Sequence, residues 1–397
     1  MPAPTPPDIL TATIPDVRPL ASLLKSLSFK ARATVRIDAE GIRMTVEEGR
    51  SIQAHAYITR ACFTTYTFVL SADSSSACFS PAPSPPSPRS SSSSASPEPQ
   101  GTPYCQLTVS LSTMLECLNI FGNAGTASGA NAFKKDYDGG DGEGGDEGGW
   151  KRRRGRRSGE DDEGRGRGGG RGGADEGKQT SLRLTYAGIG EPLVMLLEES
   201  GTVTRCELTT YEPEGLLDLA FEDADRVQRL IMKSEWLRDA LLELPPSSEK
   251  LSISFSPAGH RRAAPSNRYR SRRDGMEQDD EGGGEADEDE VPLFRLESVG
   301  TLGSTEMDYS DDRDILEVFE CEFPMRNTYK FSHIQLTRQA LAASMKTSIR
   351  TDEHGLVSFQ FMIPLSAAKG GGGAQASVAD GRVAFVEFLC VALDEEY

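Results

Sequence analysis

Two carboxylates separated by one residue, Asp38 and Glu40, form the pair in this sequence that is best suited to catalysis. Carboxylates at this spacing can hold Mg²⁺ and activate water, and such a pair begins the metal-dependent sites of 3′–5′ exonucleases. A complete site of that kind needs further aspartates on ordered elements. The pair also precedes Gly41 at the apex of a predicted strand–turn–strand, where Asp and Glu are common turn residues. We therefore interpret both as turn residues and keep exonuclease catalysis as the alternative.

Other potential metal ligands are scattered along the sequence. The acidic run ADEDE at 286–290 has no fixed geometry and is typical of a solvated segment. His55 falls in a predicted strand and His354 in a predicted turn, and neither has a Cys or His partner at zinc spacing. The seven cysteines include no CxxC pair, and several stand in apolar runs, as reduced buried thiols do. The sequence predicts no metal site and no cofactor.

Basic side chains stand on the polar faces or near the ends of the predicted helices. Arg18 and Lys25 are seven residues apart and so share one helical face. A protein that contacts phosphates without reading bases needs only a few such cations. We predict a DNA-facing set that consists of Arg18, Lys25, Arg229, Lys233, Arg238, Arg338 and Lys346. The alternative is that these are ordinary charges of solvated helix faces, and the predicted helix LSTMLECLNI carries no Lys or Arg.

The overall charge balance is acidic, with a net charge of −18 and a pI of about 4.8. This argues against a protein that wraps nucleic acid over most of its surface, but not against one small basic surface. The run KRRRGRR is a predicted nuclear import signal made of Lys151, Arg152, Arg153, Arg154, Arg156 and Arg157. An Arg/Gly segment at 164–173 resembles segments that touch nucleic acid loosely, although acidic residues are interleaved with both.

Four stretches of the chain share one pattern: a short strand, an amphipathic helix, and alternating strands joined by Gly-bearing turns. The first copy has a predicted strand at 9–14. The helix that follows carries an apolar stripe at the spacing of one helical face. That stripe consists of Leu20, Leu23, Leu24 and Leu27.

The other three copies begin in the same way. The second and third have predicted strands at 104–109 and 227–233, and Ser234 is the predicted N-cap of the third helix. The fourth copy has a predicted strand at 329–334 and a weak, Ala-rich helix near 336–345. Helices that each bury one stripe on a sheet leave their other faces along one surface of the molecule.

Four blocks have the composition of disorder, with few branched apolar residues and much Ser, Pro, Gly or charge. They lie at about 72–100, 124–178, 258–290 and 367–379. The remainder is long enough for two domains with real cores, which we place at 9–212 and 213–397. No apolar run approaches the length of a membrane span, and the N-terminus lacks a signal-peptide pattern. We expect a protein of a reducing compartment that does not enter a membrane.

Long strings within the repeated pattern resemble one known family. In order, the chain contains PDVRPLASLLKSLSF, GIRMTVEEGRSIQAHAYI, SLSTMLECLNIFG, PLVMLLEESGTVTRCEL, SEWLRDAL and SIRTDEHGLVSFQFM. These strings resemble the Rad-one family of the DNA-damage checkpoint clamp. The resemblance covers nearly all of the chain outside the four blocks and stops at the blocks.

The resemblance implies the α+β sliding-clamp fold, like that of proliferating cell nuclear antigen: two similar domains, each with two helices packed on antiparallel sheets. It implies a non-catalytic subunit that forms a ring with Rad-nine and Hus-one type subunits in the nucleus. A clamp loader places such a ring on double-stranded DNA at damage, without sequence specificity. There the ring supports checkpoint kinase activation and recruits repair and checkpoint proteins.

The segment LTTYEPEGLLDLAF at 208–221 looks like the interdomain connector of clamps, and we call it the connector. In the resembling family a groove beside this segment accepts short partner peptides. The predicted peptide contacts are the connector residues Leu208, Tyr211, Leu216, Leu217, Leu219 and Phe221. The alternative is that the segment is only a tether between domains.

Overall fold

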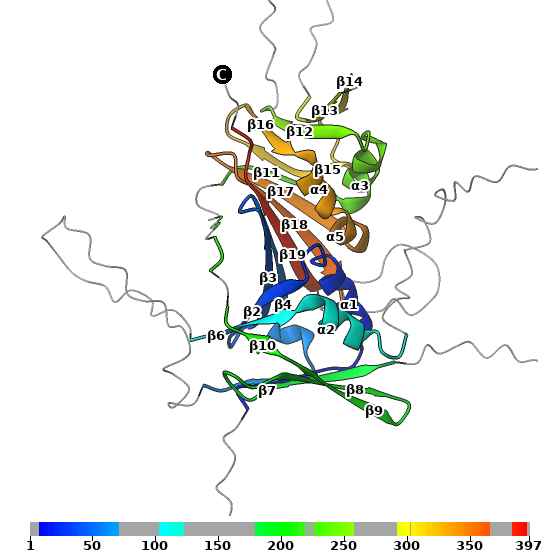
Figure 1. Cartoon of the computed structure of the whole chain (residues 1–397). Coiled ribbons are helices and arrows are strands. Elements are labelled where there is room, and N and C mark those ends of the chain that lie inside the picture. The colour runs from blue at the N-terminus through cyan, green and yellow to red at the C-terminus, as the bar shows by residue number, and fades with distance from the viewer. Residues whose placement is uncertain are drawn as a thin grey trace, which may run out of the picture.

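The structure is a computed structural model that describes residues 8–70, 103–122, 179–213, 215–217, 219, 221, 226–257, 292–301, 303–365 and 383–394. The four low-complexity blocks and the predicted import signal at 151–157 lie outside these residues. The described part is rich in antiparallel strands and has a few short helices, as the predicted α+β class requires (Figure 1). None of the helices in these ranges is long and apolar enough to cross a membrane.

The largest unit is a ten-stranded antiparallel sheet, which we call the central sheet. Its strands, in spatial order, are β10 (Thr210–Tyr211), β6 (Cys105–Ser110), β2 (Arg32–Ile37), β3 (Gly41–Glu48), β4 (Ile52–Thr59), β19 (Val383–Cys390), β18 (Val357–Pro364), β17 (Lys346–Asp352), β11 (Arg226–Lys233) and β15 (Leu316–Cys321). At its middle β4 pairs with β19, with Phe385 opposite Tyr57 and Cys390 opposite Ile52. This pairing joins the N-terminal and C-terminal parts of the chain in one sheet.

Two smaller sheets complete the strand framework. The first has the order β5 (Thr65–Phe68), β1 (Leu10–Ile14), β7 (Ser181–Tyr186), β8 (Leu193–Glu199) and β9 (Thr202–Leu208). The second has the order β14 (Gly303–Tyr309), β13 (Phe294–Gly300), β12 (Ser248–Phe255) and β16 (Met325–Lys330). Each smaller sheet lies at one end of the molecule, beyond the helices of its own part of the chain (Figure 1).

The helices lie along one side of the molecule and form what we call the helix row (Figure 1). The row consists of α1 (Val17–Lys25), α2 (Leu111–Leu118), α3 (Ser234–Glu243), α4 (Phe331–Leu336) and α5 (Arg338–Ala343). Within it α1 packs against α2, α3 packs against α5, and α1 also contacts α5. The contact between α1 and α5 makes the row continuous across the N-terminal and C-terminal parts.

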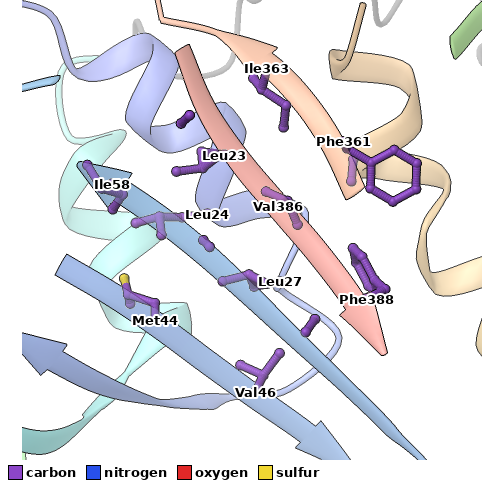
Figure 2. Packing of buried hydrophobic residues seen from close by; sticks show 14 of the residues in the cluster. Leu23, Leu24, Leu27, Met44, Val46, Ile58, Phe361, Ile363, Val386 and Phe388 are labelled. Carbon is purple, nitrogen blue, oxygen red and sulfur yellow. The ribbon is translucent and has the colours of Figure 1, made fainter. Parts of the chain in front are cut away.

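Helix α1 shows how the sequence produces this arrangement. The Asp16 side chain caps the helix by accepting from the Arg18 backbone N–H at 3.0 Å. Leu23, Leu24 and Leu27 are fully buried, as the predicted stripe requires. Figure 2 shows them beside Met44 of β3, Ile58 of β4 and Val386 of β19. The stripe of α1 therefore covers the β4–β19 junction at the middle of the central sheet.

The predicted N-cap at Ser234 is wrong. Ser234 is the first residue of α3, and Lys233 is the N-cap, without a side-chain hydrogen bond to the helix. The Ser234 hydroxyl is buried instead, 2.9 Å from Thr347 Oγ1, and it accepts from Ser344 Oγ at 2.7 Å. It joins α3 to β17 and to the end of α5, because buried hydroxyls take the partners that tertiary packing offers.

The predicted strand at 329–334 is also wrong beyond Lys330, where β16 ends and α4 begins. Phe331, Ile334 and Leu341 are buried at helical spacing, so the apolar stripe starts earlier than predicted. Thr337 separates α4 from α5 and donates its hydroxyl to the Ile334 carbonyl at 2.7 Å. A single weak helix is thus replaced by two short ones.

Candidate nucleic-acid interface and connector groove

Two of the predicted DNA-facing residues lie on α1. The Arg18 guanidinium forms a fork with the Asp16 carboxylate, and its Nη2 is 2.7 Å from Oδ2. The hydrogen bond with Asp16 raises the pKa of Arg18 above its ordinary value. Lys25 is the last residue of α1, where its charge complements the helix dipole. The fork fixes the position of Arg18 but also neutralises part of its field.

Two more predicted cations lie at the other end of the helix row. Arg238 on α3 is half-buried, with Nε 3.2 Å from the Asp239 carboxylate. Arg338 is the first residue of α5 and has no ion-pair partner in the part of the chain that the structure describes. The charged residues of the five helices are Arg18, Lys25, Arg238 and Arg338 against Glu116, Glu235, Asp239 and Glu243. Any attraction for phosphates is therefore local to a few cations rather than spread over the row.

The remaining three predicted cations do not join the helix row. Lys346 and Lys233 stand opposite each other on β17 and β11, and Arg229 lies further along β11. Leu230 and Met232, which alternate with Arg229 and Lys233, are fully buried on the helix side. Since strand neighbours point to opposite faces, Arg229, Lys233 and Lys346 lie on the face of the central sheet away from the helices.

The Asp38–Glu40 pair forms a tight turn between β2 and β3. The Asp38 carboxylate Oδ1 accepts from the backbone N–H groups of Glu40 at 2.9 Å and Gly41 at 3.1 Å. Its Oδ2 lies 3.5 Å from Arg36 Nε. Among the described residues, no group of three or more His, Cys, Asp and Glu side chains is arranged to hold a metal ion. These bonds give Asp38 the turn role that the sequence indicates.

A groove of about 690 Å³ lies between the connector and the central sheet, on the face away from the helices, and we call it the connector groove. Its connector side is lined by Pro213, Gly215, Leu216, Leu217, Leu219 and Phe221. Its sheet side is lined by Arg36, Arg43, Thr45, Gln53, His55, Tyr57, Tyr104, Gln106, Glu387 and Leu389. Four of the six predicted peptide contacts line this groove, while Leu208 is buried in the core and Tyr211 pairs with β6 in the central sheet.

The connector is held to the sheet at defined points. The Leu217 backbone N–H donates to Glu47 Oε2 at 2.8 Å, and its carbonyl accepts from Gln53 Nε2 at 2.8 Å. The Phe221 ring lies 4.7 Å from the Arg350 guanidinium carbon, a cation–π contact. These contacts hold Leu217 and Phe221 at set positions along the groove.

Buried polar groups form the floor of the groove around Glu387. This carboxylate accepts from Tyr57 Oη at 2.9 Å, Arg350 Nη2 at 2.8 Å and Ser358 Oγ at 2.6 Å. His55 lies directly opposite Glu387 on β4, and its Nδ1 is 2.9 Å from Thr45 Oγ1. Burial, and next the charge of Arg43, lower the pKa of His55 to about 4, so it is neutral at physiological pH.

The sequence reasoning assigned none of the residues on the sheet side to a groove, and two arginines are among them. Arg36 and Arg43 stand opposite each other on β2 and β3, and the Arg36 guanidinium carbon lies 3.9 Å from the centre of the Tyr104 ring. The signal available was their position, since each alternates with buried apolar residues in a predicted strand. Alternation puts such residues on the face opposite the core, but it does not show that a connector will cover that face.

Comparison with known proteins supports the family resemblance. A family model described as Repair protein Rad1/Rec1/Rad17 matches residues 9–363. The chain is 28% identical to the cell cycle checkpoint protein RAD1 of Mus musculus, over 98% of this chain and 93% of the mouse protein. The human protein of the same name is also 28% identical, over 98% of this chain and 92% of its own length.

A fungal relative carries a different name. The DNA repair exonuclease REC1 of Mycosarcoma maydis is 30% identical, over 97% of this chain and 96% of the fungal protein. The family model spans the four repeated stretches and the connector, from β1 to β18. The predicted resemblance is confirmed, and this chain belongs to the Rad1/Rec1/Rad17 family of repair proteins.

Proposed function

We propose that this protein is a non-catalytic subunit of a heterotrimeric, DNA-encircling checkpoint clamp in the nucleus. The observation that carries the proposal is the helix row, which runs unbroken along one side of a sheet that joins both parts of a Rad1/Rec1/Rad17 chain. The relatives named as cell cycle checkpoint proteins support a role in the DNA-damage checkpoint, repair and the cell cycle.

A sliding-clamp fold with two similar domains is part of this proposal. The boundary between β4 and β19 divides the central sheet into two sets of five strands, one that ends with β4 and one that begins with β19. One side belongs with α1, α2 and the sheet that contains β1, while the other belongs with α3 to α5 and the sheet that contains β12. This equivalence supports domains at 9–212 and 213–397, with the connector at their boundary.

The helix row is the proposed DNA-facing surface, and double-stranded DNA is the proposed ligand of the assembled ring. A ring that slides needs cations that touch phosphates without reading bases. Arg18, Lys25, Arg238 and Arg338 supply them from three helices. The connector groove, on the opposite face, is the proposed docking site for peptides of repair and checkpoint proteins. In this position the groove stays accessible while DNA occupies the ring.

The assembly is tested by purifying the full chain with its Rad-nine and Hus-one type partners and imaging the particles by electron microscopy. We expect equimolar closed rings whose inner surface is formed by helices, and a clamp loader should place these rings on duplex DNA. Partners that fail to associate, or particles without a hole wide enough for duplex DNA, would contradict the proposal.

Exonuclease catalysis is the second candidate function, because the Mycosarcoma maydis relative is named an exonuclease. The site would use Asp38 and Glu40. Asp38→Asn is the informative variant, since the amide oxygen can still accept from the Glu40 and Gly41 N–H groups that form the turn. We expect wild type and Asp38→Asn to show no difference in the Mg²⁺- or Mn²⁺-dependent release of 3′ nucleotides from DNA. Activity that the variant loses would establish the exonuclease and overturn the non-catalytic assignment.

A further inference from the structure

One end of the connector groove holds two guanidinium groups with unfilled hydrogen-bonding capacity. Arg36 Nε and Arg43 Nε are both buried, and neither has a hydrogen-bond partner in the described structure. Both residues line the groove, on adjacent strands and in direct register. A buried donor without an acceptor is unfavourable, so these two atoms favour any ligand that supplies an acceptor.

The acidic groups nearest to these arginines are committed to other partners. Asp38 uses Oδ1 in the β2–β3 turn and approaches Arg36 Nε only to 3.5 Å. Glu387 accepts from Tyr57, Arg350 and Ser358, and Glu47 accepts from Gln53 and the connector backbone. These carboxylates keep their charge, but within the described residues none of them accepts a hydrogen bond from Arg36 Nε or Arg43 Nε, so both donors are available to a ligand.

The wall that the connector contributes to the groove is apolar. Leu216, Leu217, Leu219 and Phe221 line it from the connector, and Leu389 lines it from β19. The Leu217 side chain is among the exposed large hydrophobic groups of the chain, at 38% exposure. A volume of about 690 Å³ is within the range of ligand sites, which is about 300–1,000 Å³. The groove thus presents an apolar wall beside a basic end.

We propose that the connector groove selects peptides in which an Asp or Glu carboxylate binds Arg36 and Arg43 while a neighbouring apolar side chain packs on the connector leucines. This inference rests on the proposed peptide-docking function of the groove and adds the chemical class of the peptide. Carboxylate–guanidinium pairs are the stronger, charge-assisted class of hydrogen bond. The net charge of −18 disfavours acidic peptides over the chain as a whole, so the two arginines also favour binding at this groove.

The first test is a selection from a display library of short random peptides on the full-length chain. Parallel selections use wild type, Arg43→Gln and Leu217→Asp, the last of which places a charge on the apolar wall. We expect wild type to enrich apolar residues together with Asp or Glu at one relative position. The Arg43→Gln selection should keep the apolar enrichment and lose the acidic one, while Leu217→Asp should lose both.

The second test measures the affinity of an enriched peptide by fluorescence anisotropy. Arg43→Gln should weaken binding about tenfold or more, and replacing the peptide Glu by Gln should weaken binding to wild type but not to Arg43→Gln. Arg43→Lys, which keeps the charge and loses the fork, should fall between them. Arg229→Gln is the matched control, because Arg229 also has a buried, unpartnered Nε on this face but does not line the groove. It should change affinity less than twofold.

The outcomes separate this inference from the function on which it rests. Enriched peptides that depend on Leu217 but show no acidic preference, or that ignore Arg43→Gln, would overturn the inference and leave peptide docking intact. If the selections yield no peptide whose binding depends on Leu217, both the inference and the peptide-docking function are overturned. Equal unfolding midpoints for wild type and Arg43→Gln are required for a positive result, and Arg36→Gln replaces Arg43→Gln if the latter does not fold.

Discussion

Glu387 connects the two parts of the central sheet through side chains as well as backbone. Its carboxylate accepts from Tyr57 on β4 and from Arg350 and Ser358 on β17 and β18. The Glu387–Arg350 ion pair is almost fully buried, so each charge depends on the other for solvation. This polar cluster fixes the register of β4 against β19 beneath the connector groove, since a slip would leave buried charges unpaired.

The neutral state of His55 makes stability dependent on pH. The pKa of His55 is about 4 in the folded chain and about 6.5 in the unfolded chain. As pH falls from about 6.5 to 4, the unfolded state takes up a proton that the folded state does not. Stability therefore falls over this window, by about 2 kcal/mol near pH 5 relative to neutral pH.

Urea unfolding of wild type and His55→Gln near pH 7.5 and near pH 5 checks this expectation. The other titrating groups are common to both proteins, so the difference in their pH dependence isolates His55. The variant should lose about 2 kcal/mol less than wild type between the two conditions. An identical loss in both proteins would mean that His55 is not buried in its neutral form.

At the residue scale, the sequence predicted which cations lie on helices better than it predicted the face of the sheet on which the strand cations lie. Arg18, Lys25 and Arg338 were assigned to helices, and the structure has them there. Arg229 and Lys346 were grouped with them, yet strand pairing puts both on the opposite face of the sheet. The face of a strand residue depends on register and on which side the helices cover, and neither is written in local spacing.

At the element scale, helices with long apolar stripes were predicted, α5 was predicted as part of a weak helix near 336–345, and α4 was missed. Leu20, Leu23 and Leu24 of α1, and Leu27 just beyond its end, are buried at offsets of three, four and seven residues, the spacing of one helical face. Phe331 and Ile334 are too few to distinguish a helix turn from a strand, so the start of α4 was misplaced. Strands β5 and β14 lie at sheet edges and are half-exposed, so pairing defines them more than any apolar pattern.

The opposite placement of helix-row and strand cations gives a direct test of the DNA-facing surface. Each phosphate contact adds about 0.9 to the slope of log affinity against log salt. Lys25→Ala with Arg338→Ala should therefore lower that slope by about 2 in the assembled ring, measured on short duplex DNA over a salt series.

Arg229→Ala with Lys346→Ala is the matched control, with the same charge change on the face away from the helices. We expect its slope to equal that of wild type. If the two double variants lowered the slope equally, DNA contact would not be confined to the helix row, which would contradict the proposed DNA-facing surface.

At the scale of the whole molecule, the sheets have open edges. In the described part of the chain, β9 is one of the two edge strands of the sheet that contains β1, and its Val203 is 61% exposed. Unpaired strand edges associate with other strands unless they are protected. In a clamp, end strands of neighbouring subunits pair and close the ring, which would cover such an edge.

We expect the chain to be monomeric or weakly associated alone, and to form an equimolar assembly with its two partners. A net charge of −18 disfavours contact between identical chains, and a ring of unlike subunits requires self-pairing to be unfavourable. Sedimentation velocity of the isolated chain measures this. A stable homotrimer at low micromolar concentration would show that the chain forms a different kind of clamp.

Strand β19 has a consequence for how the protein is made. It follows every other described strand in the sequence, yet it lies between β4 and β18 at the middle of the central sheet. While the chain emerges from the ribosome, β4 and β18 each have an edge whose backbone groups lack this partner strand, and the α1 leucines lack Val386 as a packing neighbour (Figure 2). Such intermediates aggregate readily, so nascent chains should depend on chaperones until residues 383–390 are available to join the two halves.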